Sequence, residues 1–315
     1  MAEQQTLPVR VTGRREVATD VVEFTFGPDT GQFPAWEPGA HVDVILADTT
    51  VRQYSLCGNP NDCDTWTIAV FRSPNQDGAA RRIVDHLQPG SRIVLQGPRN
   101  RFPLIKAERY EFVAGGIGIT PLLPMIDAVS RCGVPWHLNY GGRSMEHMAY
   151  AEMLTTRYGA SVTLCPQDRD GLLDLAGIVA DLTTETAVYA CGPEGMLSAL
   201  EGLAAEASWS FHCERFAGNN EVAHRPDDEP FEVTLTSAGI TLEIQPGESI
   251  LDAVEREGVF VMSSCREGIC GSCETPVVSG EIDHRDDYLT DEERASGDVM
   301  MICVSRGCGA LELDL

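Results

Sequence analysis

The sequence has little positive charge, no long apolar run and no basic leader. Its 315 residues include 23 lysines and arginines against 48 aspartates and glutamates, a formal net charge of −25. Nucleic acids and anionic membrane surfaces bind proteins through basic patches, so this balance argues against both as partners. No apolar segment approaches the roughly 18 residues of a membrane-spanning helix. We therefore expect no nucleic-acid partner and no membrane association.

The first residues, Met1 to Gln5, lack the basic region and apolar stretch of a signal peptide, which favours a cytoplasmic protein. Eleven cysteines in such a chain indicate reduced thiols and a metal site more than a disulfide framework. The sequence shows no internal repeat and no low-complexity segment. Its length suits two or three domains.

The acidic excess is strong at the C-terminal end. From Phe231 onward there are 18 acidic and 5 basic residues, a net charge of −13. Such charge either forms a solvated surface that keeps the protein soluble or steers docking to a basic partner. Both interpretations stay open.

Four cysteines near the C-terminus have the spacing of an iron–sulfur ligand set. They are Cys265, Cys270, Cys273 and Cys303. A C-x4-C-x2-C run with one distant cysteine is typical of a plant-type 2Fe-2S site. Gly268 and Gly271 can adopt positive φ, which allows backbone N–H groups to turn toward the sulfurs. The alternatives are a zinc site or ordinary buried thiols.

Of the seven remaining cysteines, all but Cys191 are expected to be bystanders. They are Cys57, Cys63, Cys132, Cys165, Cys213 and Cys308.

Residues 7–105 are predicted to form an antiparallel barrel. Strand-like segments at 21–26, 41–46, 66–71 and 92–95 alternate with turns rich in Gly and Pro. Among them lies Arg52-Gln53-Tyr54-Ser55. Side chains alternate along a strand, so Arg52 and Tyr54 share one face. One can hold a phosphate while the other packs flat on a ring.

Residues 107–217 alternate between strand and helix signals, which predicts a parallel sheet with helices on its faces. Three predicted strands each run into a glycine-marked turn. The turns are Gly115-Gly116-Ile117-Gly118-Ile119-Thr120-Pro121, Gly141-Gly142-Arg143-Ser144 and Cys191-Gly192-Pro193. A glycine-rich turn before a helix lets a pyrophosphate approach the backbone and the helix N-terminus. We expect all three turns at the carboxyl edge of the sheet.

The remaining C-terminal residues predict a small α+β domain. Residues 231–235 and 240–244 alternate as the two strands of a hairpin. A capped amphipathic helix is expected over 249–255, with Ser249 as its N-cap. Residues 217–230 are polar and lack an apolar period, so they are predicted to be a linker.

Taken in order, these motifs resemble the ferredoxin–NADP reductase superfamily, and the module order resembles the phthalate dioxygenase reductase type of class IA oxygenase systems. The resemblance covers nearly all of the chain. It implies an antiparallel β-barrel flavin domain at 1–106 and an α/β parallel-sheet NAD-binding domain at 107–217. A linker at 218–230 and a β-grasp 2Fe-2S ferredoxin domain at 231–315 follow.

The resemblance implies a flavin site on the barrel. In it, R-x-Y-S at 52–55 is the flavin signature, and the turn Gly78-Ala79-Ala80-Arg81 corresponds to the G-G-S-R turn that cradles the FMN phosphate. This turn departs from the pattern at two of four positions. Ala80 removes a hydroxyl, so backbone N–H groups and Arg81 must hold the phosphate. FMN is favoured, and FAD stays open.

The resemblance also implies a nicotinamide site at the three turns. Gly115, Gly116 and Thr120 would line the crevice between flavin and nicotinamide, Arg143 and Ser144 would meet the adenosine, and Cys191 would lie near the nicotinamide. Gly118, Gly192 and Pro193 complete this set. NADPH-dependent relatives place basic residues after the Arg-Ser pair. Here Glu146 follows, so NADH is favoured.

The ending His212-Cys213-Glu214-Arg215-Phe216 resembles the family's H-x-E-x-F, in which the aromatic ring stacks on the flavin. The alternative is that Phe216 packs in a core. The residues implied to act in the reaction itself are Ser55, Thr120, Cys191 and Phe216.

A nicotinamide gives up two electrons as hydride and a 2Fe-2S cluster accepts one, so a flavin must convert between them. The resemblance implies a reductase that passes electrons from NADH through FMN and the cluster to a Rieske-type oxygenase. Alternatives are electron donation to a cytochrome P450 or another monooxygenase, or a redox sensor. No residue suggests substrate chemistry, so the organic substrate should belong to the partner.

Overall fold

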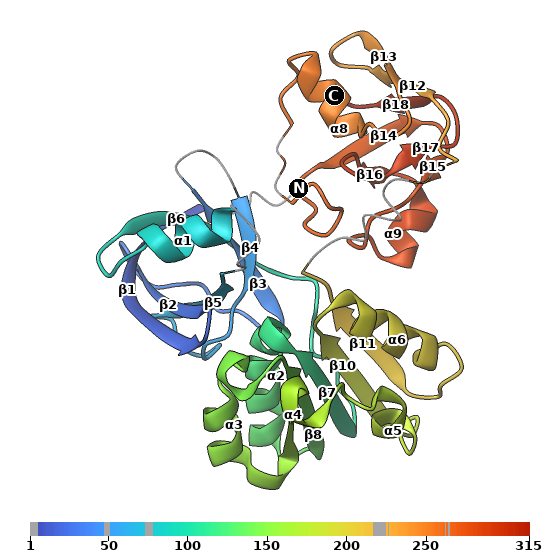
Figure 1. The fold of residues 1–315 in the computed structure, drawn as a ribbon. Helices are drawn as coiled ribbons and strands as arrows, with labels where there is room; N and C mark the ends of the chain where they lie inside the picture. The colour runs from blue at the N-terminus through green and yellow to red at the C-terminus, as the bar shows by residue number, and fades with distance from the viewer. Residues whose placement is uncertain are drawn as a thin grey trace. The chain divides into compact units, whose positions relative to one another are not determined.

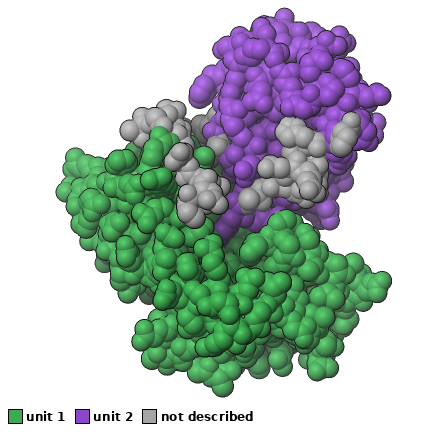
Figure 2. Space-filling model, in the orientation of Figure 1, with its two compact units in different colours: residues 1–214 green, residues 215–315 purple. Residues whose placement is uncertain are grey.

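A computed structural model describes residues 6–46, 51–72, 78–216, 225, 227–261, 263 and 265–315. The chain forms two compact units, Met1–Glu214 and Arg215–Leu315 (Figure 2). Within the described ranges, none of the helices has the length and apolar character needed to cross a membrane.

The first six strands of Figure 1 form one antiparallel sheet in the order β4-β3-β6-β1-β2-β5. Their bounds are β1 (Thr6–Ala18), β2 (Val21–Pro28), β3 (Ala40–Ile45), β4 (Val51–Ser55), β5 (Trp66–Phe71) and β6 (Arg92–Asn100). The edge strands β4 and β5 contact each other, so the sheet curls into the predicted barrel. Phe24, Phe26 and Trp66 fill its core.

Helix α1 (Ala79–His86) lies where the sequence predicted a phosphate turn. Gly78 is its N-cap, so the predicted turn is the start of a helix. The run of Ala and Arg explains this difference, since both are strong helix formers. Ile83 and Val84 of α1 are buried in the barrel core, which ties the helix start to the barrel.

The second sheet of the N-terminal unit is parallel throughout, in the order β11-β10-β7-β8-β9. The strands are β7 (Arg109–Gly115), β8 (Trp136–Gly142), β9 (Val162–Pro166), β10 (Thr186–Cys191) and β11 (Ser210–Glu214). The helical segments are η1 (Gly116–Gly118), α2 (Ile119–Cys132), η2 (Met145–His147), α3 (Ala151–Tyr158), η3 (Gly159–Ser161), α4 (Gln167–Asp170), α5 (Leu175–Val179) and α6 (Glu194–Ala204).

Two apolar clusters cover this parallel sheet. One contains α2 and α3 residues such as Leu122 and Leu154, and the other contains α5 and α6 residues such as Val179 and Leu197. The strands are therefore apolar on both faces, as parallel strands between helices must be. The alternation of strands and helices in the sequence predicted this layout.

The C-terminal unit contains a five-stranded sheet in the order β13-β12-β18-β14-β16 and a small pair, β15-β17. The elements are β12 (Phe231–Leu235), β13 (Ile240–Ile244), α8 (Ile250–Arg256), β14 (Glu274–Ser279), β15 (Ile282–Asp283), α9 (Asp291–Ser296), β16 (Val299–Met301), β17 (Arg306–Gly307) and β18 (Leu311–Leu313). The predicted hairpin is present, with Leu235 opposite Ile240. Ser249 caps α8 as expected, because its Oγ accepts the N–H of Asp252 at 3.0 Å.

The predicted linker at 218–230 is not free polar chain along its whole length. Residues 217–224 and 226 lie outside the described residues. Asp228, however, is buried in the C-terminal unit, with its side chain 3% exposed. Arg285 donates to both of its carboxylate oxygens at 2.6 and 3.0 Å, and Arg306 Nε lies 3.8 Å away. Sequence reasoning missed this pair because its partners are 57 residues apart and follow no local pattern.

Asp228→Ala should destabilise the C-terminal unit by about 3 kcal/mol, because it removes one partner of a buried bidentate ion pair and leaves the buried Arg285 guanidinium to the more exposed Asp283. Denaturant unfolding, followed through the visible absorption of the predicted 2Fe-2S cluster, measures the change. Asp227→Ala is the matched control, since Asp227 is exposed. Equal midpoints for the two variants would contradict the assignment.

Candidate functional site

The three glycine-marked turns meet at one edge of the parallel sheet. Strand register sets Cys191 beside Ala114 and Gly141 beside Gly115. A Cβ added to Gly118 would lie 2.2 Å from the Cys191 carbonyl oxygen, and one on Gly115 would lie 2.4 Å from Pro193 Cδ. Glycine is therefore required where the first and third turns pack backbone against backbone.

Gly116 differs from these packing glycines. Its φ is +56°, and an added Cβ would meet no atom within 4 Å. The position opens η1, which runs into α2, and α2 has no acidic residue in its first turn. Open space, a helix N-terminus and a left-handed glycine together fit a pyrophosphate. Thr120 is buried here, and its hydroxyl donates to the Ile117 carbonyl at 3.0 Å, which fixes the turn.

Gly192 packs against the same turn, with an added Cβ 2.9 Å from backbone atoms of Gly115. Pro193 is the N-cap of α6. At the end of β8, Arg143 is exposed, and Ser144 Oγ lies 2.7 Å from His147 Nδ1. The structure thus brings the predicted nucleotide residues to one sheet edge.

Ser55, Glu214 and Cys191 come together where the barrel meets the parallel sheet. Ser55 Oγ donates to Glu214 Oε2 at 3.0 Å, across 159 residues of sequence. Glu214 is the register partner of Cys191 on the neighbouring strand, and Cys191 is fully buried. Burial raises the pKa of Glu214 to about 8, against the lowering effect of the Ser55 hydrogen bond. Burial also raises the pKa of the Cys191 thiol well above its ordinary value.

Glu214 is the site residue that the sequence did not single out. It stood inside the H-x-E-x-F ending, but nothing local to it indicated a buried carboxyl. Only the Ser55 contact, made by the fold, identifies it.

The flavin signature lies on β4 as predicted. Tyr54 and Arg52 oppose Val42 and Val44 of β3, respectively. Tyr54 packs against the barrel core, and burial raises its pKa. Arg52 Nη1 donates to the Val51 carbonyl at 2.8 Å.

The start of α1 supplies the second part of the predicted flavin site. Gly78 has no side-chain cap and no acidic residue follows in the first turn, so backbone N–H groups at this helix start suit a phosphate. Ala80 packs against the barrel core, and the side chain of Ala79 lies outside the described residues. Arg81 Nε lies 3.4 Å from Asp85. The residues present fit a flavin phosphate.

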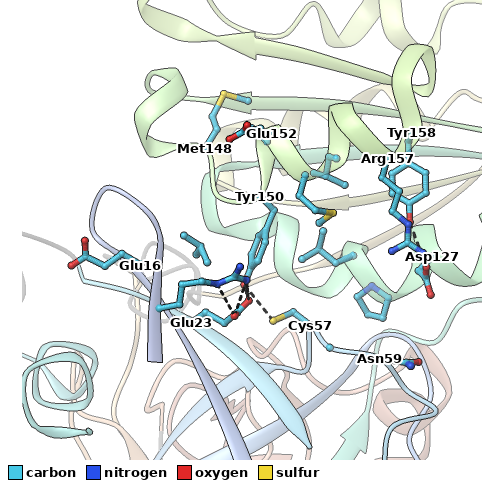
Figure 3. A pocket seen from close by; sticks show the side chains of 18 of the residues that line it. Glu16, Glu23, Cys57, Asn59, Asp127, Met148, Tyr150, Glu152, Arg157 and Tyr158 are labelled. Atoms are coloured by element: carbon cyan, nitrogen blue, oxygen red, sulfur yellow. Dashed lines mark hydrogen bonds and ion pairs between the residues drawn. The ribbon is translucent and has the colours of Figure 1, made fainter. Parts of the chain in front are cut away.

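A cavity of about 710 Å³ lies elsewhere in this unit, between the barrel and helices α2 and α3 (Figure 3). Tyr150 donates to Glu23 at 2.9 Å, Arg15 pairs with the same carboxylate at 2.9 Å, and Cys57 Sγ lies 3.8 Å from the Tyr150 hydroxyl. Of the predicted nucleotide and flavin residues, Glu146 alone is in its lining. These contacts of Tyr150 with Glu23 and Cys57 join the barrel to the parallel sheet on another side from the predicted sites. The Glu146 carbonyl accepts the Thr19 N–H at 2.7 Å.

The four predicted cluster cysteines converge in the C-terminal unit. Cys270, Cys273 and Cys303 are at most 5% exposed, and Cys265 is half-buried. Hydrogen bonds from the thiols of Cys270 and Cys303 lower the pKa of Cys265. Within the described part of the chain, no three metal-binding side chains are placed to hold a single ion.

The loop between these cysteines has the backbone geometry that the sequence predicted. The Glu267 N–H donates to Cys265 Sγ at 3.3 Å. Gly268 and Gly271 have φ of +75° and +72°. Side chains would also clash there, since an added Cβ on Gly271 would lie 2.1 Å from the Tyr288 ring. Four convergent thiols and inward N–H groups fit a 2Fe-2S cluster.

Known proteins match both units. A family model for a 2Fe-2S iron-sulfur cluster binding domain matches residues 233–308. The heme-dependent oxidative N-demethylase beta subunit of Ectopseudomonas mendocina is 38% identical over 98% of this chain and 99% of its own. The structure of phthalate dioxygenase reductase is 32% identical, with a TM-score of 0.73 and 98% of both chains covered.

This chain belongs to the phthalate dioxygenase reductase family. The carnitine monooxygenase reductase subunit of Acinetobacter baumannii is also similar, at 34% identity over 99% of this chain and 98% of its own. An intact type IV self-sufficient cytochrome P450 monooxygenase is 40% identical with a TM-score of 0.87, although this chain spans 41% of that longer protein.

These matches establish an oxidoreductase that transfers electrons as the reductase component of an oxygenase system. Its C-terminal domain is of the 2Fe-2S ferredoxin type, and its N-terminal unit has the flavin- and nucleotide-binding reductase fold. The predicted family, fold class and electron-transfer function are confirmed.

In this reductase, Cys270→Ser should abolish the visible absorption of the cluster and leave flavin absorption unchanged, because a hydroxyl matches iron far less well than a thiolate. Cys308→Ser is the control, since Cys308 is exposed and expected to be a bystander. The variants are compared by absorption spectra and iron content. Loss of iron in the Cys308 variant would contradict the ligand set.

Glu214 predicts a pH dependence of stability. The folded carboxyl keeps its proton up to about pH 8, whereas an ordinary glutamate releases it near 4.5. The free energy of unfolding should therefore fall as pH rises between these values. Glu214→Gln should show a smaller fall, measured by denaturant unfolding of the N-terminal unit at both ends of this window. Identical slopes in wild type and variant would contradict the buried, protonated carboxyl.

Proposed function

We propose that this protein is an NADH-dependent, FMN-containing reductase that passes electrons through its 2Fe-2S cluster to a Rieske-type oxygenase. The observation that carries the proposal is the meeting of Ser55 from the barrel with Glu214 and Cys191 from the parallel sheet. It brings the flavin strand to the edge where the three nucleotide turns lie.

In the proposed flavin site, Arg52, Tyr54 and Ser55 of β4 hold the ring and its chain. Gly78, Ala79, Ala80 and Arg81 hold the phosphate through the start of α1. A flavin bound there supplies the conversion between a two-electron hydride donor and a one-electron acceptor. Burial raises the pKa of Glu214 to about 8, so the carboxyl beside Ser55 is neutral near pH 7.

FMN is proposed because the short phosphate site resembles that of the FMN-binding group and no adenine platform is evident in the sequence. Release of the flavin by heat, followed by chromatography, tests this. Recovery of FAD would overturn it.

In the proposed nicotinamide site, Gly116 and the start of α2 receive the pyrophosphate, Thr120 lines the crevice between flavin and nicotinamide, and Cys191 lies near the nicotinamide. Gly115, Gly118, Gly192 and Pro193 shape the crevice, and Arg143 and Ser144 meet the adenosine. Glu146, exposed two residues after Ser144, disfavours a 2′-phosphate. The ratio of kcat/KM for NADH over NADPH should exceed about tenfold, equivalent to about 1.4 kcal/mol. A ratio near one would contradict this assignment.

Phe216 is proposed to cover the flavin face on which the nicotinamide must stack. Its side chain is 42% exposed, which disfavours the alternative of a residue packed in a core. Phe216→Ala should change nicotinamide affinity or the rate of flavin reduction and leave the cluster spectrum intact. Rapid mixing with NADH measures both quantities. A change in stability alone would support the core interpretation.

Heme is the second candidate for the partner's redox centre. A heme-dependent demethylase subunit and a self-sufficient cytochrome P450 are among the similar proteins. Similar reductase subunits also serve carnitine and toluene-4-sulfonate monooxygenases. Anaerobic mixing of the reduced protein with a Rieske-type oxygenase component and with a P450 heme domain distinguishes the two. Faster reduction of the heme protein would overturn the Rieske assignment.

We also propose a cytoplasmic location.

A further inference from the structure

Phe260 is the most exposed of the large apolar side chains within the described residues, at 88%. It lies in the segment between α8 and the cluster loop. Its neighbours Val259 and Val261 pack against the core of the C-terminal unit. Both valines are partly buried, whereas Phe260 between them is exposed to solvent. Phe260 therefore exposes its aromatic ring to solvent instead of packing it in the core.

This ring lies close to the cluster loop. Phe260 precedes Cys265 by five residues, so the two Cα atoms are at most ~18 Å apart even if the segment is fully extended. Ser263, in the same segment, donates through its Oγ to Glu255 Oε1 at 3.4 Å, which ties the segment to α8. Phe260 is thus an exposed apolar contact point on the segment that leads into the cluster loop.

Carboxylates of α8 lie at the same place. Arg266, the residue after the first cluster cysteine, donates to Asp252 at 2.7 Å and to Glu255. Glu257 follows at the end of α8 and is exposed. Residues 248–267 contain five acidic and two basic side chains. The aromatic ring is therefore bordered by negative charge.

Both parts of the chain carry an excess of acidic side chains. Residues 1–214 contain 26 acidic and 16 basic side chains, and residues 215–315 contain 22 and 7. An acidic surface attracts a basic one at long range. The charge balance thus favours a separate, basic protein as the occupant.

We propose that Phe260, with the carboxylates of α8, forms the surface that docks the electron-accepting protein, whose docking face has basic residues around an apolar recess. Aromatic residues at the centre of an interface contribute most of its affinity, and surrounding charges set the rate of encounter. This inference rests on the proposed function, because it requires that electrons leave through the cluster.

Cytochrome c, a basic one-electron acceptor protein, is the probe. Phe260→Ala should raise its KM about tenfold with little change in kcat, as expected for loss of an interface anchor. NADH-dependent ferricyanide reduction and the cluster spectrum should stay unchanged. Leu172→Ala is the matched control, since Leu172 is 79% exposed but lies in the N-terminal unit, in the loop between α4 and α5. An unchanged KM for the Phe260 variant would overturn the proposal.

Charge reversal tests the acidic border. Glu257→Lys should raise the KM for cytochrome c at low ionic strength, and high salt should remove the difference from wild type. Glu206→Lys, an exposed residue of the N-terminal unit, is the control. Equal effects of the two reversals would mean that only net charge matters and would contradict a local docking surface.

The competing occupant is the chain's own N-terminal unit. Rapid mixing with NADH resolves it, since docking between the units would make Phe260→Ala slow the reduction of the cluster itself. That result, with an unchanged KM for cytochrome c, would overturn the proposal. If wild-type protein reduces ferricyanide but not cytochrome c, the electron path through the cluster fails instead, and the proposed function with it.

Discussion

The backbone contact between the first and third glycine turns is the constraint on which the nucleotide site depends. Gly118 lies so close to the Cys191 carbonyl that no side chain fits between them. This contact sets the ends of β7 and β10 side by side and leaves Gly116 open beside the start of α2. From there, β10 and its neighbour β11 carry Cys191 and Glu214 to Ser55 of the barrel. A larger residue at Gly118 would separate the turns that the coenzyme must bridge.

Local patterns in the sequence predicted the parts of the fold that are determined by residues near one another in the chain. The cysteine spacing, the three turns after apolar strands and the Ser249 cap depend on residues close together in the chain, and the structure places them as expected. Strand β1 was not singled out, because only Val9 and Val11 of its 13 residues are fully buried and the rest is largely polar. The start of α1 was taken as a turn although its residues favour a helix.

Pairings between distant residues could not be predicted in the same way. Glu214 with Ser55, Asp228 with Arg285, and Tyr150 with Glu23 each join segments that the fold brings together, and a single sequence carries no local signal of such pairs. These contacts share one consequence. The Glu214–Ser55 and Tyr150–Glu23 contacts hold the barrel on the parallel sheet, and the Asp228–Arg285 contact holds the segment before β12 on the cluster-bearing unit.

The central claim is that electrons pass from the nicotinamide through the flavin to the cluster. Anaerobic rapid mixing with NADH, followed at separate flavin and cluster wavelengths, tests it most directly when the protein is compared with a flavin-depleted preparation that retains its cluster. The account predicts that the flavin absorbance falls first, that the cluster absorbance follows, and that the depleted preparation shows no cluster reduction until flavin is restored. Reduction of the cluster at an unchanged rate without flavin would contradict the account.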